Sequence, residues 1–341
     1  MAVSLREVAA TAGVSLSTAS RVFTNAATVS PEIRERVLAA GEALGYRPRS
    51  RNGRQEAPTL KHVILLIRMH KRLDLAAMLG DFYGYVLQGV EAECRRQRIS
   101  MRFAIDDGSS LETQLERLDP PDESGILLVG PFTAEDVAAV QRNDYPLVLL
   151  NNLVDQPVDA ILPDYFAGAQ IAVRHVLEAG HRRIAYLHGR NRYTTNLRLQ
   201  GYEAALREAG IMLDPQWIVK SSMAPQSARE AVAELLARKT GCTAIFCVND
   251  ISAYGALLAL ADAGLRPGVD LSLVGFDDID LSALTTTRLT TIHVPMVEMG
   301  ALAVRRLQER AAAPQSPVQR VLLGVHLVER DTVNAPAAAA P

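Results

Sequence analysis

The chain has 341 residues, of which 48% are hydrophobic and 22% charged, and its net charge is −2. This is the composition of a soluble protein with room for two or three domains. No apolar run approaches the ~20 residues of a membrane span, the N-terminus lacks a signal-peptide core, and three cysteines are too few for a disulfide framework or zinc site. We therefore expect a cytoplasmic protein with no membrane partner, metal or cofactor.

The charge is concentrated unevenly along the chain. Residues 1–61 hold nine Lys and Arg against five Glu, a net of +4, so the rest of the chain carries −6. A basic head on an acidic body indicates that the head meets a polyanion. A solvated basic surface is the alternative.

The stretch LREVAATAGVSLSTASRV, residues 5–22, predicts two short helices. Ser4 and Glu7 have the spacing of a capping box, Gly13 suits a tight turn, and Ser15 can cap a second helix that runs to about Phe23. Two such helices form a helix-turn-helix. Its second helix presents small hydroxyls and Arg21, which suits the major groove of DNA, whereas a helical hairpin in any small bundle is the alternative.

A third helix is predicted from Ser30, a cap that is followed by Pro31 at the first helical position. Gly45 marks its end. Its buried stripe is Ile33, Val37, Ala40 and Leu44. Residues 47–59, RPRSRNGRQEAPT, then have the composition of a linker.

From residue 61 onwards, short apolar runs alternate with amphipathic helical stretches. The runs are residues 62–67, 100–105, 125–129, 146–150, 159–163, 183–188, 243–248 and 271–276. This alternation predicts parallel sheets covered on both faces, and eight units indicate two similar doubly wound lobes. Ligands of such sheets bind at the carboxyl ends of strands, which selects Asn151, Asn249, Asp250 and Asp277.

Several stretches resemble the lactose/galactose-repressor family of bacterial transcription regulators. They are residues 4–48 and the later motifs GHRRIAYLHG, LRLQGYEAALREAGI, TAIFCVNDISAYGAL, LSLVGFDDIDLSAL and LTTIHVP. The resemblance covers about residues 4–332. It implies an N-terminal all-α helix-turn-helix domain (1–46), an Arg-rich linker (47–60) and a periplasmic-binding-protein-like effector domain (61–332). Lobe 1 would take about 61–162 and 293–322, and lobe 2 about 163–292 and 323–332, before a disordered tail (333–341).

For the head, the resemblance implies base readout by Leu16, Ser17 and Arg21. Leu16 either meets a thymine methyl or packs against the first helix. The phosphate-contact positions of the family correspond to Ser4, Ser15, Thr18, Ser20, Thr24 and Ser30. The linker departs from the family because it lacks the leucine of a hinge helix and contains Gly53 and Pro58. Our hypothesis is that Arg49, Arg51 and Arg54 enter the minor groove or follow the phosphates instead.

For the effector domain, the resemblance adds Arg198 to Asn249 and Asp277 as recurrent effector contacts. The alternatives are a surface ion pair of Arg198 with Glu203, a plain loop position for Asn249, and turn capping by Asp278. Phe82 and Tyr83 fall near a family position where aromatic residues face the ligand, and packing under the next helix is equally open. Met223 stands where several sugar-responsive members have an aromatic platform.

The implied function is a DNA-binding transcriptional regulator, a repressor, that acts as a homodimer on a near-palindromic operator. A small-molecule effector, a sugar, would bind between the lobes, and no catalytic residue is expected. A nucleoside or another polar metabolite is the alternative effector. A sugar-binding receptor or a metabolic enzyme is a more distant alternative, although no glycine-rich phosphate loop and no G-x-S-x-G motif occur.

Overall fold

The computed structural model describes residues 5–15, 18–19, 22, 29–44, 46, 60–68 and 82–336. The chain divides into two compact units between Pro58 and Thr59, and each is described by itself. Gly45, the linker 47–59 and the end of the predicted tail lie outside the described residues.

The first unit contains α1 (Leu5–Thr11) and α3 (Pro31–Ala43), with Thr18, Ala19 and Val22 in helical conformation between them. The corner after α1 is made by Gly13, whose φ of +61° lies in the left-handed region that glycine adopts without strain. Ser15 Oγ then accepts the N–H of Thr18 at 3.1 Å. The predicted turn and the predicted cap of the second helix are thus confirmed.

A small aliphatic core holds these helices together. Its buried members are Val8, Ala9, Ala12, Ala19, Val22, Val37 and Ala40, with Ile33 and Leu44 packed against them. Ser30 Oγ accepts the N–H of Ile33 at 3.4 Å and so caps α3, as predicted. Arg36 Nη2 donates to the carbonyl of Ala12 at 2.7 Å, which fixes α3 to the turn.

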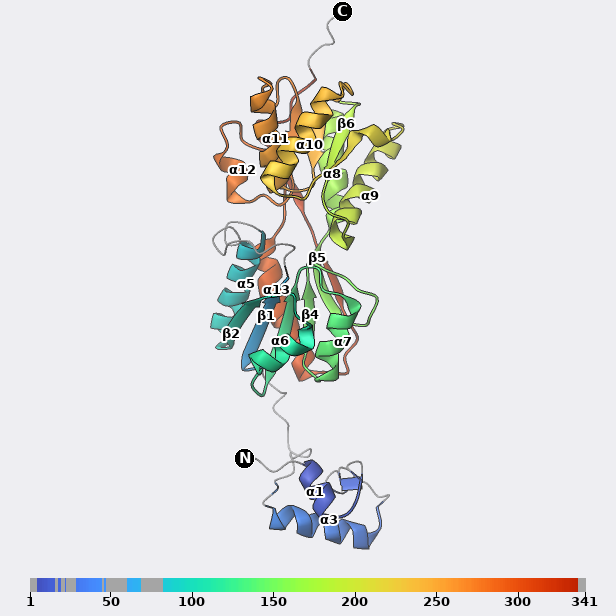
Figure 1. Ribbon diagram of the computed structural model, residues 1–341, viewed down its shortest axis with the longest axis vertical. Helices are drawn as coiled ribbons and strands as arrows, with labels where there is room; N and C mark the ends of the chain where they lie inside the picture. The colour runs from blue at the N-terminus through green and yellow to red at the C-terminus, as the bar shows by residue number, and fades with distance from the viewer. Residues whose placement is uncertain are drawn as a thin grey trace, which may run out of the picture. The chain divides into compact units, whose positions relative to one another are not determined.

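The second unit contains two parallel sheets with helices on both faces, which confirms the predicted fold class (Figure 1). The first lobe has six strands, in spatial order β11 (Arg320–Leu323), β5 (Asp159–Pro163), β4 (Leu147–Leu150), β3 (Ser124–Val129), β1 (His62–Ile67) and β2 (Ser100–Ile105). One face packs against α5 (Phe82–Gln97) and α13 (Met296–Ala312), and the other against α6 (Leu111–Leu118) and α7 (Ala134–Arg142).

The second lobe has four strands, in spatial order β7 (Ile218–Lys220), β6 (Ile184–His188), β8 (Ala244–Cys247) and β9 (Ser272–Val274). One face is covered by α8 (Tyr165–Glu178) and α9 (Tyr193–Glu208), and the other by α10 (Pro225–Ala237) and α11 (Asp250–Asp262). Smaller elements are the 3-10 turn Pro215–Trp217 and α12 (Asp280–Leu284).

Three segments connect the lobes at the waist seen in Figure 1. The first follows β5. The second contains β10 (Thr291–His293), and the third follows β11 and contains β12 (His326–Val328). β10 and β12 pair with each other as an antiparallel ladder. We call these the crossover segments.

Two glycines allow α5 and α13 to pack in direct backbone contact. A Cβ on Gly89 would lie 1.9 Å from the carbonyl oxygen of Val297, and one on Gly300 would lie 2.3 Å from that of Val86. Both contacts are far shorter than van der Waals contact and involve backbone atoms. The first lobe therefore requires glycine at these two positions.

Asp250 is a fully buried carboxyl at the start of α11. It accepts hydrogen bonds from Thr291 Oγ1 at 2.6 Å and from the N–H of Ile279 at 3.0 Å. Burial raises its pKa from 3.8 to about 7, against the opposing effect of these bonds. The folded chain therefore holds this proton more tightly than the unfolded chain does.

We expect Gly89→Ala to destabilise the chain by about 2 kcal/mol or more, because the new methyl group overpacks a backbone contact. Gly324→Ala is the matched control, since nothing lies within 4 Å of a Cβ there. Thermal unfolding of the two variants should lower Tm for the first alone. Equal Tm values would contradict the close approach of the two helices.

We expect Asp250→Asn to flatten the pH dependence of stability. Because the pKa of Asp250 is higher in the folded chain, its proton stabilises the fold fully below the unfolded pKa. This stability is lost as the pH rises through about 7. Wild type should therefore lose roughly 3 kcal/mol relative to the variant between pH 5 and pH 8. Asp262→Asn, which breaks an exposed pair with Arg229, should follow wild type in urea titrations at both pH values. An Asp250→Asn curve parallel to wild type would show that the buried carboxyl is ionised.

Candidate functional site

The polar residues that the strand-end rule selects do follow the carboxyl ends of strands in both lobes. Asn151 follows β4, Asn249 follows β8, and Asp277 lies three residues after β9. Asn249 and Asp277 are buried, at 7% and 5% exposure, and Asn151 is partly buried. Polar side chains from both lobes are thus held away from bulk water at the edges where parallel sheets bind ligands.

Arg198 forms the centre of this arrangement. The side chain projects from α9 and is 4% exposed, so it is not the surface residue of the alternative interpretation. Its guanidinium carbon lies 4.1 Å from the ring centre of Tyr165 and 4.4 Å from that of Phe276. Nη2 lies 3.5 Å from Asp277 Oδ1, and the buried Nε has no hydrogen-bond partner among the residues that the structure describes. This guanidinium is fixed by two aromatic faces rather than by a full set of acceptors.

The backbone holds Asp277 against the second crossover segment. Its φ is +112°, an uncommon conformation for a residue other than glycine. Its N–H donates to the carbonyl of Ile292 at 2.9 Å, and its own carbonyl accepts the N–H of Val294 at 3.3 Å. These bonds offset the strain of the backbone and aim the carboxylate at Arg198.

Arg198, Tyr165, Phe276 and Asp277 together are called the Arg198 group. Asn151 connects the first lobe to it. Its Oδ1 accepts the hydroxyl of Tyr165 at 2.5 Å, and the Tyr165 ring lies against Arg198. Burial raises the pKa of Tyr165, with Arg198 opposing that shift and the nearby Tyr83 adding to it. Phe82 is 6% exposed and packs in the hydrophobic core with other residues of α5. It therefore takes the packing role that the sequence left open, rather than a position facing the ligand.

Asn249 is the N-cap of α11, and its Oδ1 accepts the N–H of Ser252 at 3.0 Å. It is therefore a helix cap rather than a plain loop position. Because the side-chain oxygen is engaged, a ligand would meet the amide nitrogen of Asn249.

Two polar residues beside Arg198 were not predicted from the sequence. Arg192, the N-cap residue of α9, has a buried Nε that no described residue hydrogen-bonds, and its Nη2 lies 3.6 Å from Met223 Sδ. His188 ends β6 and has a buried, unpartnered Nδ1, and burial together with Lys220 and Arg198 lowers its pKa. His188 is at a strand end, so the strand-end rule applied to the last residue of each run would have found it.

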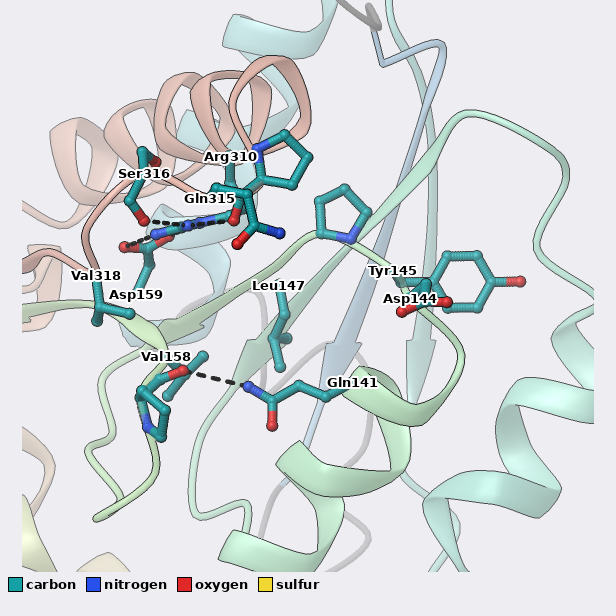
Figure 2. A pocket seen from close by; sticks show the side chains of 13 residues that line it. Gln141, Asp144, Tyr145, Leu147, Val158, Asp159, Arg310, Gln315, Ser316 and Val318 are labelled. Atoms are coloured by element: carbon teal, nitrogen blue, oxygen red, sulfur yellow. Dashed lines mark hydrogen bonds and ion pairs between the residues drawn. The ribbon is translucent and has the colours of Figure 1, made fainter. Parts of the chain in front are cut away.

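A separate hollow of about 490 Å³ lies at the opposite, amino edge of the six-stranded sheet (Figure 2). Its cation, Arg310, donates to Asp159 and to the carbonyls of Pro314, Ser316 and Pro317. Burial opposes ionisation of Asp159, but the bonds from Arg310, the Gln319 N–H and Arg306 outweigh it and lower its pKa. Arg310 and Asp159 thus hold each other by close hydrogen bonds, whereas Arg198 reaches Asp277 only at 3.5 Å.

The structure describes only part of the predicted DNA interface. Ser15 and Ser30 are exposed and Thr18 is partly buried, and all three lie at helix starts. The remaining predicted positions lie outside the described residues: Ser4, Leu16, Ser17, Ser20, Arg21, Thr24, Arg49, Arg51 and Arg54. Across the described ranges, no helix is long and apolar enough to cross a membrane, and no group of three His, Cys, Asp or Glu side chains is placed to hold a metal ion.

Comparison with known families and solved structures follows the same division of the chain. Residues 4–49 match the bacterial regulatory proteins of the lacI family, and residues 173–333 match the periplasmic binding protein-like domain. Among solved structures, the transcriptional regulator CelR in complex with cellobiose has a TM-score of 0.73 at 27% identity, over 97% of this chain and 99% of that one. The lac repressor dimer bound to operator and the anti-inducer ONPF has a TM-score of 0.71 at 26% identity, over 98% and 100%.

Curated relatives align over almost the whole length. The ribose operon repressor of Haemophilus influenzae is 32% identical over 96% of this chain and 98% of the relative. The HTH-type transcriptional repressor PurR of the same species is 29% identical over 97% and 98%. The chain therefore belongs to the lacI family of bacterial regulatory proteins, which are DNA-binding transcriptional regulators.

Proposed function

We propose that this chain is a transcriptional repressor whose affinity for operator DNA is controlled by a small polar effector, a sugar, bound around Arg198. The observation that carries the proposal is the state of this guanidinium. It is buried between Tyr165 and Phe276 and reaches Asp277 only at 3.5 Å, and its Nε has no partner in the described part of the chain. A buried cation with unfilled donors is costly, and a ligand that accepts those hydrogen bonds would relieve the cost.

The groups around Arg198 suit vicinal hydroxyls. A guanidinium only donates, a carboxylate such as that of Asp277 only accepts, and a hydroxyl does both, so a diol can bridge the pair. The amide nitrogen of Asn249 and the Nε of Arg192 would add further donors. The complex of CelR with cellobiose and the name of the ribose operon repressor favour a carbohydrate. The edge of a nucleoside base also presents both donors and acceptors of hydrogen bonds, so a nucleoside is the alternative effector.

The head supplies the DNA contacts in this proposal. Leu16, Ser17 and Arg21 would read base edges in the major groove, and the predicted phosphate contacts would fix the helix pair on the backbone. Ser15 and Ser30 are exposed at helix starts, where hydroxyls and backbone amides reach phosphate oxygens. Two chains would form a homodimer and place two heads on the half-sites of a near-palindrome, in keeping with the lac repressor dimer bound to operator.

Effector and operator affinities are coupled reciprocally in this scheme. A ligand that binds one arrangement of the lobes better than another shifts the population and thereby changes the presentation of the heads. We propose that the chain acts in the cytoplasm and has no catalytic role.

The test combines a ligand screen with operator binding. Thermal shift of the full chain against ribose, cellobiose, sugar phosphates and nucleosides should give at least one stabilising compound, worth about 2.7 kcal/mol at a hundredfold excess over Kd. That compound should change the Kd for a labelled DNA fragment from upstream of the gene. A chain that neither binds the fragment nor responds to any compound would contradict the proposal.

We expect Arg198→Met to weaken effector binding at least about 30-fold, because a charge-assisted hydrogen bond worth about 2 kcal/mol or more is lost. Methionine keeps an apolar stem between the two rings, so operator affinity without effector should remain at the wild-type value. Arg174→Met is the matched control, since Arg174 forms an exposed pair with Glu208 on the surface of the same lobe. Calorimetry with the stabilising compound measures the effect, and equal affinities in the two variants would exclude Arg198 as a contact.

We expect the combined substitution of Arg49, Arg51 and Arg54 by alanine to weaken operator binding and flatten its salt dependence. Each phosphate contact contributes about 0.9 to the slope of log K against log salt, so the slope should fall by about 2.7. The control replaces three exposed arginines of the second lobe, Arg207, Arg238 and Arg266. An unchanged slope in fluorescence anisotropy titrations would show that these three arginines make no phosphate contacts and that the linker only connects the two units.

A further inference from the structure

The loop that carries Asp277 is also bonded to the crossover segments through its next residue, Asp278. The Oδ2 atom of Asp278 lies 2.9 Å from Nδ1 of His293, in β10. Its Oδ1 accepts from Nη2 of Arg330 at 2.6 Å, just beyond β12. One carboxylate therefore joins the loop to the second and the third crossover segments at once, and it does not cap a turn of the backbone.

The two crossover segments are also joined to each other at this point. His293 and His326 are partners in the β10–β12 ladder, and their ring centres lie 4.7 Å apart. Arg330 Nη1 donates to the carbonyl of Leu289 at 2.8 Å and to Ser282 Oγ at 3.0 Å. We call Asp278, His293, His326 and Arg330 the crossover cluster.

The same loop contacts the first lobe two residues further on. The N–H of Asp280 donates to the hydroxyl oxygen of Tyr85 at 3.1 Å. Tyr85 belongs to α5 of the first lobe, whereas Asp280 begins α12 of the second. The loop thus has three contacts along its length. Asp277 contacts Arg198, Asp278 contacts the crossover segments, and the backbone of Asp280 contacts the first lobe.

Within the loop, the Asp278 carboxylate accepts a hydrogen bond from Ser282 Oγ at 3.3 Å, and the backbone fixes the loop as well. The backbone bonds of Asp277 to Ile292 and Val294 already hold it against β10. What the Asp278 carboxylate adds is a tie to the third crossover segment through Arg330. Through these bonds, the loop that carries Asp277 is joined to both crossover segments.

We propose that Asp278 is a positioning residue, which locks the relative arrangement of the two lobes through the crossover cluster and makes that arrangement respond to Asp277. The proposal rests on the proposed function in taking Asp277 as an effector contact. The lock itself acts in the free chain and is measurable with no effector and no DNA.

The test is the distribution of distances between the lobes, measured by pulsed electron resonance on the full chain. Spin labels are placed at Glu116→Cys on α6 and Ala233→Cys on α10, both exposed, in a Cys242→Ala background that removes the least buried native thiol. Labelled chain is exchanged into an excess of unlabelled chain so that one labelled copy is measured per dimer. We expect a narrow distribution for wild type and a broadened distribution, shifted by several ångströms, for Asp278→Asn.

A second variant separates the lock from a general loss of stability. His293→Phe keeps the ring that stacks on His326 but removes the nitrogen that faces Asp278, so it should broaden the distribution equally. The double variant should be no broader than either single variant, because both remove one interaction. Asp262→Asn, which breaks a pair within the second lobe alone, should stay as narrow as wild type.

Narrow distributions in both Asp278→Asn and His293→Phe would overturn the proposal. Equal broadening in Asp262→Asn would overturn it as well, because the effect would not belong to the crossover cluster. The distance measurement contains no ligand, so a failed effector screen does not affect its result. Likewise, unchanged distances would not contradict the proposal that an effector binds at Arg198.

Discussion

The second unit depends on one costly feature, a buried guanidinium held by aromatic faces. Arg198 is 4% exposed, stacks between Tyr165 and Phe276, and reaches its carboxylate at 3.5 Å. Side chains on two separate segments, α8 and the loop after β9, must be in place before this cation can leave water. Tyr165 is itself held by Asn151 of the first lobe, so the position of Arg198 depends on both lobes.

The geometry of parallel sheets places this group where the two lobes are joined. The carboxyl ends of β4, β8 and β9 place Asn151, Asn249 and the loop of Asp277 near the crossover segments rather than at the outer ends of the lobes. The loop from Asp277 to Asp280 then has bonds to both lobes. A ligand that completes the hydrogen bonds of Arg198 therefore acts where the lobes are joined, which is what population shift between two arrangements requires.

Much of the fold follows from local patterns in the sequence, and the rest depends on distant residues. The runs 62–67, 100–105 and 159–163 coincide with β1, β2 and β5, because apolar runs between helical stretches are strong signals. The strands β7, β10, β11 and β12 were not predicted, because they have three or four residues and β11 and β12 are half exposed. Asn249 and Asp277 follow from the strand-end rule, whereas Arg198 came only from family resemblance, since its burial is created by Tyr165 and Phe276. The local sequence around Asp278 predicts only a turn cap, because Arg330, its partner in the structure, lies 52 residues away in the chain.

The most direct test of the account is the structure of the full chain with the compound that stabilises it most. We expect polar atoms of that compound at hydrogen-bond distance, about 2.7–3.2 Å, from the guanidinium of Arg198 and the carboxylate of Asp277. We also expect an acceptor on the Nε of Arg198, which has no partner among the described residues. A compound bound instead in the hollow beside Arg310, with the Arg198 group unchanged, would contradict it.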